Sequence, residues 1–224
     1  MEKIIFHKET KTFHLYNEEI SYIMCVLENG HMGQLYYGKR IHDKPDFSYL
    51  VEKCGRPMTS YIFEGDRSFS LEHIRQEYPV YGTTDYRHPA IEIMQENGSN
   101  ISEFKYVGYE ILKGKPSLKG LPATYTESEE EAETLKIILK DSLTGAKLTL
   151  LYTIFSKGSA IARSAHICNE GEKVLHLQTM MSLNLDLPDK DYVWMQLSGA
   201  WSRERYVKNR ILEQGITAID SMRG

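Results

Sequence analysis

The chain has 224 residues, of which 41% are hydrophobic and 26% are charged, a composition typical of a soluble globular protein with room for one large domain. Lysine and arginine (27) are outnumbered by aspartate and glutamate (31), and the net charge of −4 argues against a general nucleic-acid binder. No apolar run approaches the roughly 20 residues of a membrane span, and the charged N-terminus lacks the apolar core of a signal peptide. Cys25, Cys54 and Cys168 form no CxxC pair. We therefore expect a cytoplasmic protein with reduced thiols, no metal and no cofactor.

Short extended segments dominate the first part of the chain. Residues 20–27 are almost continuously apolar, which predicts a strand covered on both faces. Residues 32–37 resume an extended pattern after a Glu-Asn-Gly turn. Residues 40–67, with several prolines, glycines and aromatic side chains, are too long for an ordinary connection. We expect this long segment to be functional, structured in its own way, or mobile.

Turn residues at short spacing separate the extended segments that follow. Residues 91–93 and 104–112 flank an Asn-Gly pair at 97–98, which predicts a hairpin between them. Further strands are expected at residues 134–140, 147–155, 161–168 and 174–187. Helical character is confined to residues 69–76 and to residues 126–133, where the glutamate-rich sequence predicts a solvated loop or one helical turn. This series of strands predicts an all-β sandwich.

The densest polar and aromatic cluster lies in residues 77–89. Glu77, Asp85, Arg87 and His88 are candidates for an acid–base site, and the tyrosines between them suit stacking on a sugar ring. The alternative is a stiff loop held by an ion pair between Asp85 and Arg87, and this is the more common use of such residues.

Two other polar clusters favour structural roles. In residues 199–206, Glu204 stands between Arg203 and Arg205, a pattern that suits an interdomain ion-pair network. Residues 183–191 hold three aspartates but lack the glycine and the terminal glutamate of a calcium-binding loop. The histidines form no metal motif, and the sequence contains no nucleophile elbow and no phosphate-binding loop. The motifs therefore assemble no complete active site.

Three long blocks carry a family resemblance, at residues 77–90 (EYPVYGTTDYRHPA), 113–125 (KGKPSLKGLPATY) and 198–215 (SGAWSRERYVKNRILEQG). Shorter blocks that agree in the same order are NGHMGQLYYGK, AETLKIILKD and IARSAHICNEG. With these blocks, residues 13–224 resemble the N-terminal domain of family 36 α-galactosidases. The resemblance implies a galactose-mutarotase-like β-supersandwich of two large antiparallel sheets with a few short helices, forming one N-terminal domain over residues 1–224.

The resemblance also implies an activity for a longer protein. In that family the N-terminal domain precedes a (β/α)₈ barrel and a small C-terminal β domain, and the enzyme removes terminal α-1,6-linked galactose from melibiose, raffinose and stachyose with retention of configuration. Retention needs two carboxyl groups about 5 Å apart. In the family both are aspartates of the barrel, which would follow Gly224. We therefore expect this chain to contain no catalytic residue and to be inactive alone.

A role at the active-site rim is implied as well. Many members of the family are homotetramers in which a loop of the N-terminal domain reaches the active-site mouth of a neighbouring subunit. That loop follows YYGK, so it corresponds to residues 40–67, with Phe47 as the expected sugar-contacting aromatic residue and Tyr49 as the second choice. An aromatic ring suits the apolar face of galactose. The family's loop aspartate is not assigned to Asp46 or Glu52, because the loop length differs in this region.

Two other functions stay open at this point. The chain could be a stand-alone carbohydrate-binding or scaffold domain, or an active mutarotase-like enzyme. The second requires a histidine and a carboxylate in one cleft, which only Glu77 or Asp85 with His73 or His88 could supply. A gene that continues past Gly224 into a barrel-length sequence would favour the galactosidase, whereas a stop codon there would favour the binding module.

Overall fold

The computed structural model describes residues 3–55, 58, 60–120 and 123–222. Strands form nearly all of its regular structure, and the two helical segments are single 3₁₀ turns, η1 (Ser48–Leu50) and η2 (Glu129–Glu131). In chain order the strands are β1 (Ile4–His7), β2 (Thr12–Tyr16), β3 (Ile20–Val26), β4 (Met32–Lys39), β5 (Ile91–Gln95), β6 (Phe104–Lys113), β7 (Ala132–Asp141), β8 (Ala146–Phe155), β9 (Ile161–Asn169), β10 (Leu175–Met180), β11 (Val193–Ala200) and β12 (Arg203–Ile211).

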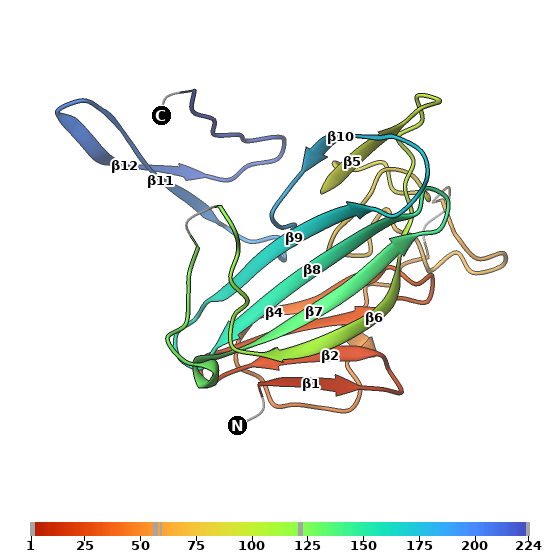
Figure 1. The fold of residues 1–224 in the computed structure, drawn as a ribbon, viewed down its shortest axis with the longest axis horizontal. Helices are drawn as coiled ribbons and strands as arrows, with labels where there is room; N and C mark the ends of the chain where they lie inside the picture. Colours follow the sequence, from red (N-terminus) through yellow and green to blue (C-terminus); the bar gives the residue numbers. More distant parts are fainter. Residues whose placement is uncertain (1–2, 56–57, 59, 121–122, 223–224) are drawn as a thin grey trace. The chain divides into compact units, whose positions relative to one another are not determined.

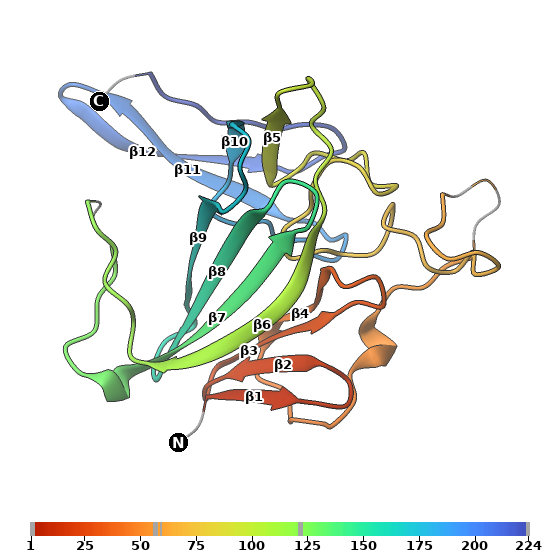
Figure 2. The same cartoon turned by 45° about the vertical axis from the view of Figure 1, so that its right-hand side comes forward.

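Two four-stranded antiparallel sheets make up most of the fold. One has the strand order β1-β2-β3-β4 and the other the order β6-β7-β8-β9, and Figures 1 and 2 show them packed face to face. Because side chains alternate between the faces of a strand, each sheet sends one set of apolar residues into the space between the sheets. Phe13, Met24, Leu135 and Leu148 are fully buried in that core. The predicted all-β fold with two large antiparallel sheets is confirmed.

Strand β3 is buried on both faces, as its apolar sequence predicts. Tyr22 and Met24 belong to the core between the sheets, whereas Ile23 and Cys25 belong to a second apolar cluster on the other side of the same sheet. His14 on β2 is the cross-strand partner of Ile23 and therefore also lies on this outer face.

The connection between β4 and β5 covers the outer face of the sheet β1–β4. Phe47 and Phe69 are fully buried in the second apolar cluster, so the beginning and the middle of the connection pack onto the sheet. Beyond η1 the connection extends away from both sheets, on the right in Figure 2. The helical character expected for residues 69–76 amounts to one turn, in which the Ile74 amide donates to the Ser70 carbonyl at 3.2 Å.

The hairpin predicted around the Asn-Gly pair is wrong. The turn itself forms, with Gly98 at φ +81° and its amide bonded to the Gln95 carbonyl at 2.9 Å. However, β5 pairs with β10 and β6 pairs with β7, so the chain crosses from one sheet to another after the turn. Pairing with β10 accompanies the burial of Ile91 and Ile93 in the core, a non-local gain that a turn signal does not report. The strands predicted at residues 134–140 and 147–155 are confirmed, and they pair as the β7–β8 hairpin.

The chain divides into two compact units, one ending at Asp186 and the other beginning at Leu187. The first unit holds both four-stranded sheets, and the second holds the β11–β12 hairpin. The single N-terminal domain expected over residues 1–224 stays a prediction. Across the part of the chain that the structure describes, no helix has the length and apolar character needed to cross a membrane.

One face of the β11–β12 hairpin is apolar and exposed. Val193 pairs with Ile211 and Leu197 pairs with Val207, and Met195 lies between them on the same face. These five side chains are between 57% and 69% exposed. The apolar face of a sheet normally packs against another layer, so we call this surface the hairpin face and treat it as a candidate contact.

Candidate functional site

The segment that follows β4, residues 40–51, is termed the cover segment. The Thr10 hydroxyl, from the turn between β1 and β2, donates to the Pro45 carbonyl at 3.1 Å. Asp46 then accepts the Ser48 amide through its side chain at 2.7 Å, an Asx-type turn that leads into η1. The Asx-type turn therefore sets the local backbone conformation of the cover segment, and the hydrogen bond from Thr10 attaches the segment to the sheet β1–β4.

The two aromatic residues predicted to contact sugar lie in different environments. Phe47 is 0% exposed, and its ring meets the His14 ring edge-on, with centroids 5.5 Å apart. Tyr49 is 63% exposed, and the Lys44 ammonium lies 5.5 Å from the centre of its ring. In this chain a ligand can reach Tyr49 but not Phe47, and the sugar contact expected of these residues stays a prediction.

Four side chains, termed the Asp43 clasp, join the cover segment to three strands. His14 Nδ1 on β2 and His7 Nε2 on β1 lie 2.7 Å and 3.0 Å from the same oxygen of Asp43. His14 Nε2 lies 2.9 Å from the Ser21 hydroxyl on β3. His14 and Ser21 are fully buried, whereas the Asp43 side chain is 31% exposed. One end of the clasp, at Ser21 and His14, is therefore buried under the cover segment, and the other end, at Asp43, reaches solvent.

Burial controls the electrostatics of the clasp. It lowers the pKa of His14 below the ordinary value of 6.5, although the bond to Asp43 acts in the opposite direction. Burial alone would raise the pKa of Asp43, but the bonds from His14 and His7 bring it below its usual value. A neutral His14 beside an ionised Asp43 is the state that these shifts favour near pH 7.

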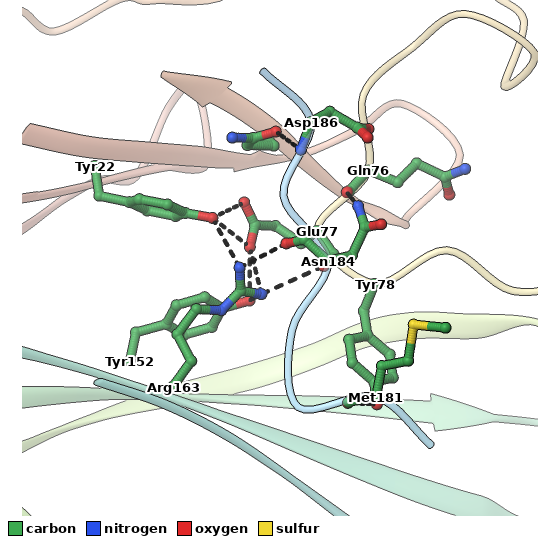
Figure 3. Close-up of polar contacts among 10 residues, drawn as sticks. Tyr22, Gln76, Glu77, Tyr78, Tyr152, Arg163, Met181, Asn184 and Asp186 are labelled. Atoms are coloured by element: carbon green, nitrogen blue, oxygen red, sulfur yellow. Dashed lines mark hydrogen bonds and ion pairs between the residues drawn. The ribbon is translucent and has the colours of Figure 1, made fainter. Parts of the chain in front are cut away.

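A second polar group, the Glu77 centre, lies inside the core between the sheets (Figure 3). Glu77 is fully buried and accepts hydrogen bonds from the Tyr22 hydroxyl at 2.7 and 2.9 Å and from the Tyr152 hydroxyl at 2.8 Å. Arg163 donates to the same carboxylate at 3.1 Å. Its guanidinium also lies over the Tyr152 ring, 4.7 Å from the centroid. Both carboxylate oxygens therefore have hydrogen-bond donors, as a buried charge requires.

The Glu77 centre also fixes the chain that follows β10. Arg163 donates to the Asn184 carbonyl at 2.7 Å, and the Asn184 amide donates to the Gln76 carbonyl at 2.9 Å. Burial raises the pKa of Glu77, and the neighbouring Arg163 and the two phenol hydroxyls offset part of that rise. We interpret the Glu77 centre as a structural tie between the sheets, because the carboxylate is fully buried and both of its oxygens already accept hydrogen bonds from the core.

The structure does not bring the predicted acid–base residues together. Asp85 is buried and bonds Arg87 at 2.9 Å, which agrees with the alternative of an ion-paired loop. His88 is exposed and bonds the carbonyl of the next residue. Both ring nitrogens of His73 are buried without a partner among the described residues. Neither of these histidines pairs with Glu77 or Asp85 among the described residues, so the particular histidine–carboxylate pairs expected for a mutarotase-like enzyme do not form.

The two other polar clusters also lack an assembled site. Arg203 and Arg205 lie in the exposed β12 strand, with Glu204 between them accepting the Ser202 amide at 3.0 Å. The interdomain role expected of this cluster stays a prediction. Within the described ranges, no group of three or more His, Cys, Asp or Glu side chains could hold a metal ion, and this includes the aspartates of residues 183–191.

The Asp43 clasp is not visible as a sequence motif, because its members are scattered along the chain. Strand pairing brings His7, His14 and Ser21 onto neighbouring strands, and the covering chain then supplies Asp43. One signal was available, since His14 stands between Phe13 and Leu15 in an alternating strand and must therefore face away from their core.

Comparisons with known proteins place the chain in a family. Residues 30–224 match the family model described as the glycosyl hydrolase family 36 N-terminal domain. The chain is 42% identical over 221 residues to alpha-galactosidase AgaA of Geobacillus stearothermophilus, and 34% identical over 222 residues to alpha-galactosidase Mel36A of Lactobacillus acidophilus. Each match covers 99% of this chain and 30% of the relative.

Solved structures show the same relationship. The alpha-galactosidase from Lactobacillus brevis superposes with a TM-score of 0.93 at 37% identity, over 98% of this chain and 30% of that one. A variant of AgaA in complex with raffinose gives a TM-score of 0.89 at 42% identity, over 95% of this chain and 30% of that one. The chain thus spans about 30% of the length of the relatives that it matches. It belongs to the glycosyl hydrolase family 36 N-terminal domain family and corresponds to the N-terminal part of the GH36 alpha-galactosidases.

Proposed function

We propose that this chain is the non-catalytic N-terminal domain of a retaining α-galactosidase that hydrolyses terminal α-1,6-galactosides such as melibiose and raffinose. The observation that carries the proposal is the match of almost the whole chain to alpha-galactosidases over only 30% of their length. The saturated Glu77 carboxylate supports it, because its oxygens are committed to the core and not to a substrate. Hydrolysis by this chain alone would contradict the non-catalytic role.

The cover segment is the part of the chain that we propose for the active-site rim of a neighbouring subunit. Tyr49 offers an exposed ring beside a lysine, which suits the apolar face of galactose and its hydroxyls. Phe47, buried against His14, supports the backbone from which Tyr49 projects.

The rim proposal is tested with the full-length protein and a nitrophenyl α-galactoside. Replacing Tyr49→Ala removes one partly exposed contact, so KM should rise roughly three- to tenfold while kcat stays within about twofold. Tyr125→Ala, which truncates a tyrosine that is 78% exposed and outside the cover segment, is the matched control and should leave both constants unchanged. Unchanged KM in the Tyr49→Ala variant would overturn the rim role.

For assembly, we propose that the hairpin face contacts a second copy of the chain within a homotetramer. Five apolar side chains in a contiguous exposed patch form the kind of surface that marks a protein–protein contact. Within the described ranges the hairpin is also two-stranded and so has an unpaired edge on each side, which is a further route to pairing between copies. Cytoplasmic localisation stays a prediction.

A further inference from the structure

The hydrogens of the Asp43 clasp follow from its heavy-atom contacts. The Ile41 amide donates to the Ser21 hydroxyl oxygen at 3.0 Å, so the Ser21 hydrogen is free to point at His14 Nε2. His14 then carries its proton on Nδ1 and donates it to Asp43. All three polar groups are satisfied only when His14 is neutral in this tautomer.

The order Ser21, His14, Asp43 is the order of a nucleophilic triad, but its environment excludes that chemistry. Ser21 and His14 are both 0% exposed, so a substrate carbonyl cannot approach the hydroxyl oxygen. That oxygen already accepts the Ile41 amide. The exposed end of the clasp is Asp43 in the cover segment. We therefore look for the function of the clasp in what it does to the cover segment.

A short path of contacts leads from the clasp to Tyr49. The His14 ring touches Asp43 at one edge and the Phe47 ring at another. Phe47 is the N-cap of η1, and its ring lies 6.4 Å from the ring of Tyr49. Asp43, where the clasp attaches to the cover segment, thus lies four residues before Phe47 and six before Tyr49. A substitution of Asp43 therefore alters the contacts that hold both aromatic residues in position.

We propose that Asp43 and His14 are positioning residues, which hold the exposed Tyr49 ring in place at neutral pH and release the cover segment in mildly acidic solution. This inference rests on the proposed rim role of Tyr49. Its basis is geometric, because two buried or partly buried histidines from separate strands converge on one carboxylate oxygen of the cover segment. The other side-chain hydrogen bonds to the segment come from Thr10, Ser21 and Arg75, and Phe47 adds apolar packing.

The direction of the pH effect follows first from the burial of His14, which lowers its pKa, and then from the charged and titratable groups that face it. These are His7 from β1, and Arg40 and Asp43 from the cover segment. Ser21 from β3 is neutral. Protonation of Nε2 would place a second N–H against the Ser21 hydroxyl, whose hydrogen would then lose its acceptor. Lower pH therefore places an imidazolium in a buried site and leaves the Ser21 hydrogen without an acceptor, and release of the cover segment would remove both costs by exposing His14 to water.

The test measures KM and kcat of the full-length protein with a nitrophenyl α-galactoside between pH 5 and 8. The native protein should show a rise of KM as the pH falls below about 6.5. Asp43→Ala should raise KM roughly three- to tenfold at pH 7 with kcat within about twofold, and should flatten that rise. Asp43→Asn keeps an oxygen that accepts from both histidines, so it should restore most of the native KM at pH 7. His166→Gln, an exposed strand histidine, is the control and should behave as the native protein does.

The outcomes separate this inference from the proposed function. If Tyr49→Ala raises KM but Asp43→Ala does not, the clasp does not position the ring and the inference is overturned. If Tyr49→Ala itself has no effect, the rim role fails first. Should Asp43→Ala not fold, His7→Ala removes one of the two contacts at a side chain that is 17% exposed. An unchanged KM and pH profile in that variant would equally overturn the inference.

Discussion

Replacing Arg163→Met should destabilise the chain far more than replacing an exposed arginine. Arg163 is the only cation that contacts the Glu77 carboxylate among the described residues, and it also donates to the Tyr22 and Tyr152 hydroxyls and to the Asn184 carbonyl. A methionine fills a similar volume but donates no hydrogen bond. The substitution therefore leaves a fully buried carboxylate with only two phenol donors.

The magnitude follows from the cost of an uncompensated buried charge. Breaking a buried ion pair by removing one partner typically costs about 3–5 kcal/mol, which is a large part of the roughly 5–15 kcal/mol that stabilises a domain. For a chain of this length, 1 kcal/mol shifts Tm by about 2–4 °C. The Arg163→Met variant should therefore melt roughly 6–20 °C below the native chain.

Urea unfolding of this chain, followed by far-ultraviolet circular dichroism, measures the effect. The cost of Arg163→Met should fall by about 1–3 kcal/mol when Glu77→Gln is already present, since the buried charge is then absent. Arg203→Met, at an exposed position, should change stability by less than about 0.5 kcal/mol. A cost below about 1 kcal/mol for Arg163→Met, or equal costs in both backgrounds, would refute the assignment of Arg163 as the counter-ion of Glu77.

Two further predictions concern pH and assembly. The pKa of His14 is lowered in the folded chain, so the unfolded chain binds a proton first as the pH falls below 6.5. The free energy of unfolding should therefore decrease by up to about 1.4 kcal/mol per pH unit until the pH passes the lowered pKa of the folded chain. Urea unfolding at pH 5 to 8 checks this, and the His14→Gln variant should show a smaller slope. Leu197→Lys on the hairpin face should reduce the oligomeric state of the full-length protein in size-exclusion chromatography with light scattering. Gln196→Lys, on the opposite face of β11, should not, and equal behaviour of the two variants would argue against the hairpin contact.

Much of the fold could be predicted from the sequence because its strongest signals are local. The apolar run at residues 20–27 indicates burial on both faces whatever covers them, and β3 is buried that way. The turn at residues 141–145 joins strands that are neighbours in both sequence and sheet. Gly98 shows the limit, because its turn forms while the partner of β5 lies about 80 residues further along, in β10. Pairing over that separation depends on packing, which no local pattern reports.

The site was less predictable for the same reason. The resemblance pointed to residues 40–67 but not to which aromatic ring in them faces solvent. Phe47 is buried because it lies over the outer face of the sheet, whereas Tyr49, on η1, projects away from it. Glu77 and Asp85, neighbours in an apparent acid–base cluster, are bound by different partners, Arg163 and Arg87. Burial and long-range partners decide these roles, and neither is visible in a short stretch of sequence.

The Glu77 centre also bears on the order in which the chain can fold. Its hydrogen bonds join residues that are 55, 75, 86 and 141 positions apart. During synthesis, Glu77 leaves the ribosome long before Arg163 and must stay hydrated until β9 has been made. The two sheets can therefore close over this carboxylate only late, which makes the sandwich a fold of high contact order whose assembly is expected to be slow.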